Sequence, residues 1–121
     1  MMEQLIEDYI RGELADAFPD IKKDEIIINF PSTSFELSEV NKRNNDKYCL
    51  GLENLTAHII ITTKEKINRL DFIRRFKIDW VDIAGVGVMQ RYIGSEQFNF
   101  YEVQKQKQVI FKIIFSYEVF E

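Results

Sequence analysis

The stretch that decides the fold is VIFKIIFSYEVF, residues 109–120. Apolar or aromatic side chains occupy every odd-numbered position in it, and this period of two predicts a β-strand. The even-numbered positions also include Ile110, Ile114 and Phe120. Because apolar side chains lie on both faces, we expect this strand to be central in a sheet or buried at an interface.

Further strands are expected on the N-terminal side of this stretch. Three consecutive isoleucines make residues 25–30 a β-branched strand, which Pro31 closes. Alternation resumes over residues 48–61, with a phase slip near Glu53 and Asn54 that predicts a bulge or a tight turn. The remaining strands are expected at residues 86–93 and 98–103, separated by the turn signal Gly94-Ser95 and preceded by a short connection at residues 81–85.

Two amphipathic helices complete the expected elements. Residues 2–18 repeat apolar side chains at helical spacing, and Pro19 ends that helix because proline disfavours helical geometry in the residue before it. The second helix is expected over residues 64–78, with Thr62 and Glu65 as a capping box. The fold class is therefore α+β: a mostly antiparallel sheet with two helices, N-terminal 2–18 and central 64–78, packed on it. The expected core comprises Leu5, Ile6, Tyr9, Ile10, Leu14, Ile59, Ile61, Ile67, Leu70, Ile73, Phe76, Phe111, Ile113 and Phe115, with Phe72 and Trp80 beside them.

The whole chain, residues 1–121, is expected to form a single domain that contains one long polar loop at residues 31–47. Seventeen residues without a regular period are long for a connection inside a domain, and such loops are usually functional or mobile. The loop nevertheless keeps Phe35, Leu37 and Val40, which a solvated linker would not need. We expect it to be mobile in an isolated subunit and to become ordered against a neighbouring chain.

Composition and charge exclude several classes of protein. The chain carries 20 acidic and 16 basic side chains, a net charge of −4, which argues against specific nucleic-acid binding. Ten phenylalanines supply more apolar volume than disordered chains carry. The single cysteine, Cys49, excludes an intrachain disulfide and a cysteine-based zinc cluster. No apolar run reaches the roughly 18 residues that a membrane span needs, so no membrane partner is expected.

Residues that could support catalysis or bind a cofactor are scarce. His58 is the only histidine, and a half-exposed strand position explains it better than metal binding. Cys49 is better explained as a small buried hydrophobe than as a nucleophile. Gly85 and Gly87 lack the third glycine and the lysine of phosphate-binding loops. We therefore expect no enzymatic activity, no catalytic residues, no cofactor and no metal.

The two expected helices differ in charge. The first is acidic, whereas the second carries Lys64, Lys66, Arg69, Arg74, Arg75 and Lys77. Both helices could simply present solvated faces. Alternatively, the acidic helix of one subunit could associate with the basic helix of the next, which would favour head-to-tail contacts. Nucleic-acid binding through the second helix is a weaker third interpretation, because no aromatic residue is interleaved on its exposed face.

The layout resembles the tail-terminator and neck proteins, which join head to tail in long-tailed bacteriophages. The resemblance lies in element order and size, and the stretch from Leu55 to Trp80, an aliphatic strand leading into a helix with paired arginines, is its most suggestive part. Members of that family are structural and form rings, usually hexameric. The resemblance implies a homo-oligomeric ring, of the kind that is usually a hexamer, in the virion, made in the host cytoplasm, with other tail or neck proteins as partners.

Two functions are therefore considered. The favoured one is a virion assembly protein that forms a ring at the tail end or neck. The alternative is a small non-enzymatic binding protein, such as an inhibitor of a host or defence enzyme, that uses residues 31–47. The expected subunit or partner contacts are Phe35, Glu36, Leu37, Glu39, Val40, Lys42, Arg43, Arg74 and Arg75.

Overall fold

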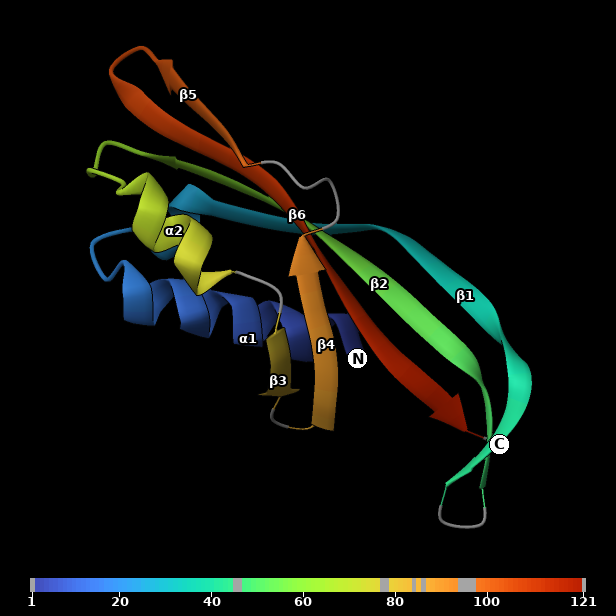
Figure 1. The fold of residues 1–121 in the computed structure, drawn as a ribbon. Coiled ribbons are helices and arrows are strands. Elements are labelled where there is room, and N and C mark those ends of the chain that lie inside the picture. Colours follow the sequence, from blue (N-terminus) through green and yellow to red (C-terminus); the bar gives the residue numbers. More distant parts are fainter. Residues whose placement is uncertain are drawn as a thin grey trace.

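A computed structural model describes residues 2–44, 47–76, 79–83, 85, 87–93 and 98–120 (Figure 1). Within these residues, the chain forms two α-helices, a 3₁₀ turn and six strands. Their bounds are α1 Met2–Ala17, η1 Lys23–Glu25, β1 Ile26–Asn44, β2 Lys47–Thr63, α2 Arg69–Arg75, β3 Asp79–Ile83, β4 Gly87–Ile93, β5 Asn99–Val103 and β6 Gln106–Phe120.

The described strands form one antiparallel sheet in the order β1-β2-β6-β4-β3, with β5 also paired to β6. β6 pairs with β2 along almost its whole length, from Lys107 opposite Thr63 to Phe120 opposite Cys49. Its other edge pairs with β5 and then with β4. The α+β class and the central position of β6 are thus confirmed, and the apolar residues on both faces of β6 follow from that position.

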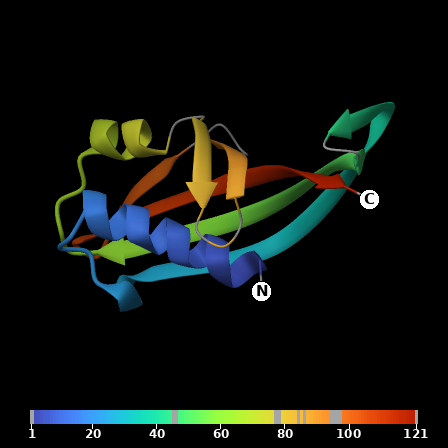
Figure 2. The same ribbon diagram turned by 90° about the horizontal axis from the view of Figure 1, so that it is seen from below.

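Both described helices lie on the same face of the sheet (Figure 2). α1 places Ile6, Ile10 and Leu14 on the sheet, all fully buried. These residues recur at helical spacing, so one stripe of α1 meets the inward-facing side chains of β2 and β6. The sheet contributes Leu55, Ala57, Ile59, Ile61, Val109, Phe111, Ile113 and Phe115. We call this side of the sheet the helix face and the opposite side the outer face.

An aromatic cluster holds α2 against the sheet. Phe72 is fully buried, and its ring lies 5.0 Å from that of Phe111 in an edge-to-face arrangement. Phe18 stacks on Phe72 at 5.3 Å, and Phe76 contacts both Phe72 and Phe111. Phe98 and Phe100 complete the cluster. Such ring pairs add about 0.5–1.5 kcal/mol each to the burial of their area, so a helix of seven residues is held firmly.

The second helix is shorter than its predicted range of 64–78. β2 continues to Thr63, and Thr62 pairs with Gln108 of β6, so Thr62 cannot act as a helix cap. Asn68 caps α2 instead, because its side chain accepts from the backbone N–H groups of Leu70 and Asp71. The predicted end at residues 77–78 lies outside the described residues.

The orientation of α2 also corrects the predicted core. Leu70 is 61% exposed and Ile73 is 42% exposed, so both were wrongly assigned to it. In a helix capped by Asn68, Phe72 and Phe76 lie one turn apart on the buried side. Leu5, Tyr9 and Ile67 are half-buried, and the Trp80 side chain lies outside the described part. The rest of the predicted core is buried, namely Ile6, Ile10, Leu14, Ile59, Ile61, Phe76, Phe111, Ile113 and Phe115.

The predicted loop at residues 31–47 is also wrong, because residues 31–44 continue β1 and β2 begins at Lys47. The two strands pair as far as Asn44 opposite Lys47. Register shifts between Asn29 and Ser32 and between Leu37 and Lys42 interrupt the ladder. Residues 31–37 are all exposed, so no buried face imposes an apolar-polar alternation on this strand. Its polar, aperiodic sequence therefore looked like a loop.

Two smaller predictions need correction. The register of β2 with β6 is continuous through Glu53 and Asn54, and the irregularity lies between Cys49 and Gly51. The expected connection at residues 81–85 belongs largely to β3, which pairs with β4. The predicted turn at Gly94-Ser95 lies outside the described residues.

Candidate functional site

The distal hairpin is the part of the sheet that extends beyond the helices. We define it as residues 31–37 of β1 and 49–54 of β2, with residues 116–119 of β6 alongside. Figures 1 and 2 show α1 and α2 beside the opposite half of the sheet, while these strands project away from them. A three-stranded segment is thus held in place by its own ladder and by the rest of the sheet.

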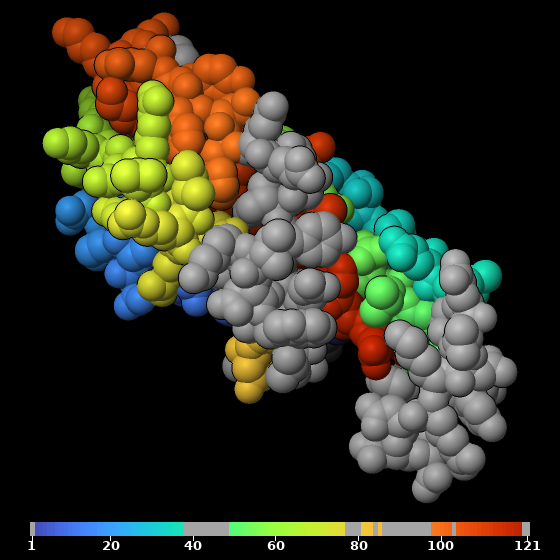
Figure 3. All heavy atoms as spheres, in the orientation of Figure 1, coloured from blue at the N-terminus to red at the C-terminus, as the bar shows by residue number. Residues whose placement is uncertain are grey.

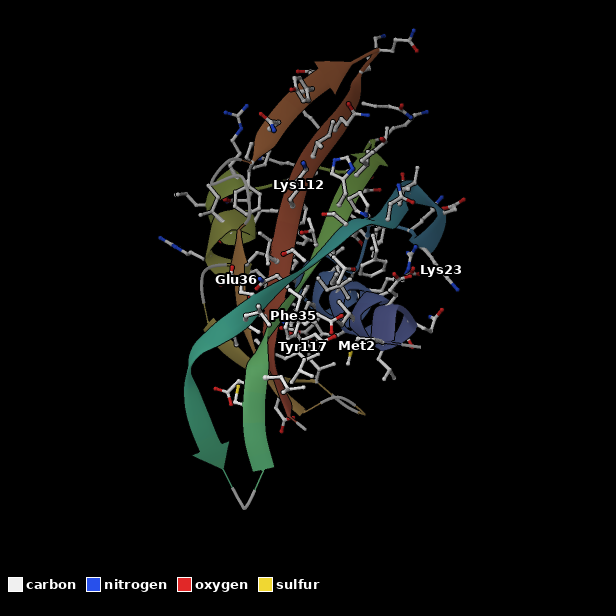
Figure 4. All side chains as sticks on the ribbon, turned by 90° about the vertical axis from the view of Figure 1, so that its right-hand side faces the viewer. Met2, Lys23, Phe35, Glu36, Lys112 and Tyr117 are labelled. Carbon is white, nitrogen blue, oxygen red and sulfur yellow. The ribbon has the colours of Figure 1, made fainter. Side chains whose placement is uncertain are left out.

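Large apolar side chains are exposed on both faces of the distal hairpin. Phe35 is 46% exposed and Leu37 is 79% exposed. They lie opposite Glu53 and Gly51, so they share the helix face. Leu52, which lies opposite Glu36, is exposed on the outer face, and Leu50 is also exposed. Figure 4 views this end of the sheet, with Phe35, Glu36 and Tyr117 labelled. Monomeric domains rarely group so many exposed apolar side chains unless these side chains form an interaction site.

Gly51 fixes the geometry of this surface. A Cβ atom at this position would clash with the Glu36 carbonyl oxygen and lie 2.9 Å from Phe35 Cζ. The absence of a side chain therefore lets the Phe35 ring lie against the backbone of β2. Glycine here serves close packing of two strands, and Phe35 is held by the sheet although nearly half of it is exposed.

The charged residues described in the distal hairpin are all carboxylates, and neighbouring side chains hold two of them. Glu53 is hydrogen-bonded to Tyr117, and burial together with this contact raises the Tyr117 pKa to about 12. On the outer face, Asn54 Nδ2 donates to Glu36 Oε1 at 3.3 Å, and the Ser116 hydroxyl donates to Asn54 Oδ1. Glu118 is exposed and lies opposite Leu52. The hairpin thus combines apolar side chains with Glu36, Glu53 and Glu118.

A second apolar and charged surface lies on α2, at the other end of the molecule. Leu70, Ile73 and Arg74 are exposed at helical spacing on the side away from Phe72. Arg69 borders them, with its guanidinium carbon 5.2 Å from the centre of the Phe100 ring. We call Arg69, Leu70, Ile73 and Arg74 the α2 patch. Figure 3 shows α2 in yellow at the surface, far from the cyan and green atoms of the distal hairpin.

Arg75 contacts the acidic helix of its own chain. Its Nε lies 2.5 Å from Glu13 Oε2 and its Nη2 lies 2.6 Å from Asp16 Oδ2. These hydrogen bonds, above all the one to Asp16, raise the Arg75 pKa. The expected attraction between the acidic and the basic helix therefore occurs within one subunit, and Arg74 rather than Arg75 faces outward.

The predicted contact residues fall into three groups. Phe35, Glu36 and Leu37 come together on the distal hairpin, whereas Arg74 and Arg75 lie on α2. Glu39, Val40, Lys42 and Arg43 belong to β1, but their side chains lie outside the described part. Leu50, Leu52, Leu70 and Ile73 were missed as surface residues. A signal for Leu50 and Leu52 was available, since they stand at even-numbered positions of β2, whereas its buried apolar residues Leu55, Ala57, Ile59 and Ile61 stand at odd-numbered ones.

Candidate groups for catalysis or metal binding do not converge in the described residues. His58 is half-buried on the outer face between Asn29 and Lys112, while Cys49 is buried with its thiol 3.6 Å from the Gly51 carbonyl oxygen. Among the described residues there is no cluster of three or more His, Cys, Asp or Glu side chains that could hold a metal ion. A shallow cavity of about 120 Å³ lies beside Ile67, Arg69 and Phe100. It is bordered by the Glu102–Lys107 ion pair.

No protein-family model and no curated protein matches this sequence. In the part of the chain that the structure describes, neither helix has the length and apolar character needed to cross a membrane.

Proposed function

We propose that this chain is a non-enzymatic structural subunit that forms a homo-oligomeric ring in a virion, at the tail end or neck that joins tail to head. The distal hairpin is the observation that supports this proposal. It carries exposed apolar side chains on both faces, beyond the reach of the described helices. A surface of this kind is typical of a protein that is completed by its neighbours.

The strand structure of residues 31–37 favours assembly more than a loop would. A loop must be ordered when it binds, at about 1–2 kcal/mol per residue, which offsets the gain from burying a few side chains. In the distal hairpin, residues 31–37 are already paired with β2, so little of this ordering cost remains when the protein assembles. Full burial of Phe35 and Leu37 then contributes roughly 1.5–3 kcal/mol each.

The proposal is tested by the mass of the protein in solution. Light scattering at rising concentration, alone and together with tail components, should show a closed oligomer of fixed mass. The variant Leu37→Asp should remain folded and become monomeric, because a carboxylate would have to be buried in the contact. The matched control Ile27→Asp places the same charge at an exposed position of β1 near the other end of the sheet.

Two results would contradict the proposal. One is a wild-type protein that stays monomeric at every concentration and with tail components. The other is a Leu37→Asp variant that assembles as the wild type does. A monomer that captures a host or defence enzyme through the distal hairpin would support the inhibitor function instead.

A further inference from the structure

The outer face of the distal hairpin contains a row of three residues with a simple pattern. Glu36, Leu52 and Glu118 lie opposite one another on β1, β2 and β6. Opposite residues in antiparallel strands point to the same face, so one exposed leucine lies between two exposed carboxylates. Glu36 is held in position by Asn54. We call this set the Glu-Leu-Glu row.

The α2 patch has the same pattern with opposite charge. Leu70 and Ile73 are exposed apolar residues, and Arg69 and Arg74 lie on either side of them along the helix. The contact of Arg69 with Phe100 fixes that side chain, and a guanidinium packed on a ring still has N–H groups free to bind a carboxylate. The patch therefore offers two apolar side chains between two cations.

The spacing of the charges matches. Glu36 and Glu118 are separated by two strand spacings, which is about 10 Å. Arg69 and Arg74 are five positions apart in the sequence, which corresponds to a rise of about 7.5 Å along a helix. The long side chain of Arg74 spans the difference. A helix laid across the three strands would thus bring each guanidinium to one carboxylate and Leu70 and Ile73 onto Leu52.

We infer that the α2 patch of one copy of this chain docks on the Glu-Leu-Glu row of the next copy. The two surfaces lie toward opposite ends of the molecule, so one chain cannot join them itself (Figures 1 and 3). A contact between two different surfaces of identical subunits is head-to-tail, and such contacts close into rings when the rotation allows it. The inference rests on the proposed ring and specifies one contact within it, on the outer face of the distal hairpin and distinct from the burial of Phe35 and Leu37 on the helix face.

Charge reversal tests the contact. One variant carries Arg69→Glu and Arg74→Glu, and the other carries Glu36→Arg and Glu118→Arg. Each should weaken subunit association by on the order of a hundredfold or more, because like charges then face each other. The variant with all four changes should assemble again, since every pair is restored with exchanged signs. An equimolar mixture of the two double variants should form oligomers in which they alternate.

The controls separate this contact from general charge and folding effects. Lys64→Glu with Lys112→Glu makes the same change in net charge as the arginine variant, at exposed positions outside the two surfaces, and should assemble normally. Circular dichroism and thermal unfolding check each fold. Should Glu36→Arg perturb the hairpin through Asn54, the exposed pair Arg74→Glu and Glu118→Arg tests the same contact, singly and combined.

Three outcomes would overturn the inference. They are normal assembly of either folded double variant, failure of the folded four-residue variant to assemble, and loss of assembly in the lysine control. All three can occur while the wild type forms its oligomer, in which case the proposed ring stands and only the surfaces are wrong. A wild type that never assembles contradicts the ring itself.

Discussion

Arg75 of α2 donates from Nε to Glu13 Oε2 of α1 at 2.5 Å, which joins the two helices across 62 residues of sequence. The same guanidinium also reaches Asp16 of α1. Both partners are partly exposed, so solvent screens the contact and its contribution to stability is modest. Its main effect is to fix the relative position of α1 and α2 over the aromatic cluster.

Replacing Arg75 with alanine should lower the free energy of unfolding by about 1 kcal/mol. The loss should shrink in 1 M salt, because partly exposed ion pairs are screened. Urea unfolding at low and high salt measures both effects. Arg74→Ala, one residue along and exposed, is the control and should change stability by less than about 0.5 kcal/mol. Equal losses for the two variants would contradict the described role of Arg75.

Phe72→Ala should cost about 3–5 kcal/mol of the free energy of unfolding, because it removes the ring that contacts Phe18, Phe76 and Phe111. Ile73→Ala should change it by no more than about 1 kcal/mol, since Ile73 is 42% exposed and alanine favours helix. Thermal unfolding of dilute protein, where subunits are separate, measures both. A large effect at Ile73 would mean that α2 is rotated relative to the structure.

Gly51→Ala should destabilise the protein by about 1–3 kcal/mol, because the new methyl group meets the Glu36 backbone and the Phe35 ring. Hydrogen exchange should show the loss concentrated in β1 and β2 of the distal hairpin. Gly12→Ala is the matched control. A Cβ at Gly12 has no atom within 4 Å, so this variant should gain about 0.5–1 kcal/mol of helix stability.

Tyr117 makes stability depend on pH in the alkaline range. Its pKa rises from 10 in the unfolded chain to about 12 in the folded one, first through burial and then through the hydrogen bond with Glu53. The folded state therefore favours the protonated phenol. The stability that this shift contributes is complete below pH 10 and is lost as the pH rises from 10 through 12.

The absorbance of phenolate measures this directly. The difference between wild-type and Tyr117→Phe titrations should show one phenol with a pKa of about 12. Glu53→Gln should move that pKa toward 10, but only in part because burial remains. A difference curve with its midpoint at pH 10 would exclude the described environment of Tyr117.

The elements with a regular apolar period, β6 and α1, were predictable from the sequence. The alternation in residues 109–120 identified β6 and its central position, and the spacing of Ile6, Ile10 and Leu14 identified α1. These elements pack against a core on at least one side, and the core imposes the period. Residues 31–37 are exposed and pack against no core among the described residues, so their pairing with β2 left no apolar period in the sequence.

The start of the second helix was harder to predict because Thr62 could belong either to the end of β2 or to the beginning of α2. Thr62 and Glu65 resemble a capping box, but the backbone of Thr62 is already used by the ladder with Gln108. Local sequence does not report such a long-range contact. The buried side of α2 is taken by Phe72 and Phe76, which leaves Leu70 and Ile73 exposed, and the helical spacing alone does not decide which of these apolar residues faces the sheet.

The central position of β6 also governs how the protein folds. In the described sheet, the β1–β2 hairpin and the β3–β4 hairpin meet only through β6, which pairs Ser116 with Asn54 on one side and Gln90 on the other. Each hairpin can form locally, within microseconds. Joining them requires the β2–β6 contacts, which at Ser116 and Asn54 link residues 62 positions apart, and such contacts make folding slow, typically milliseconds to seconds. Docking of β6 is therefore the step that commits the chain to its native state, and mutations along its centre should slow folding rather than only speed unfolding.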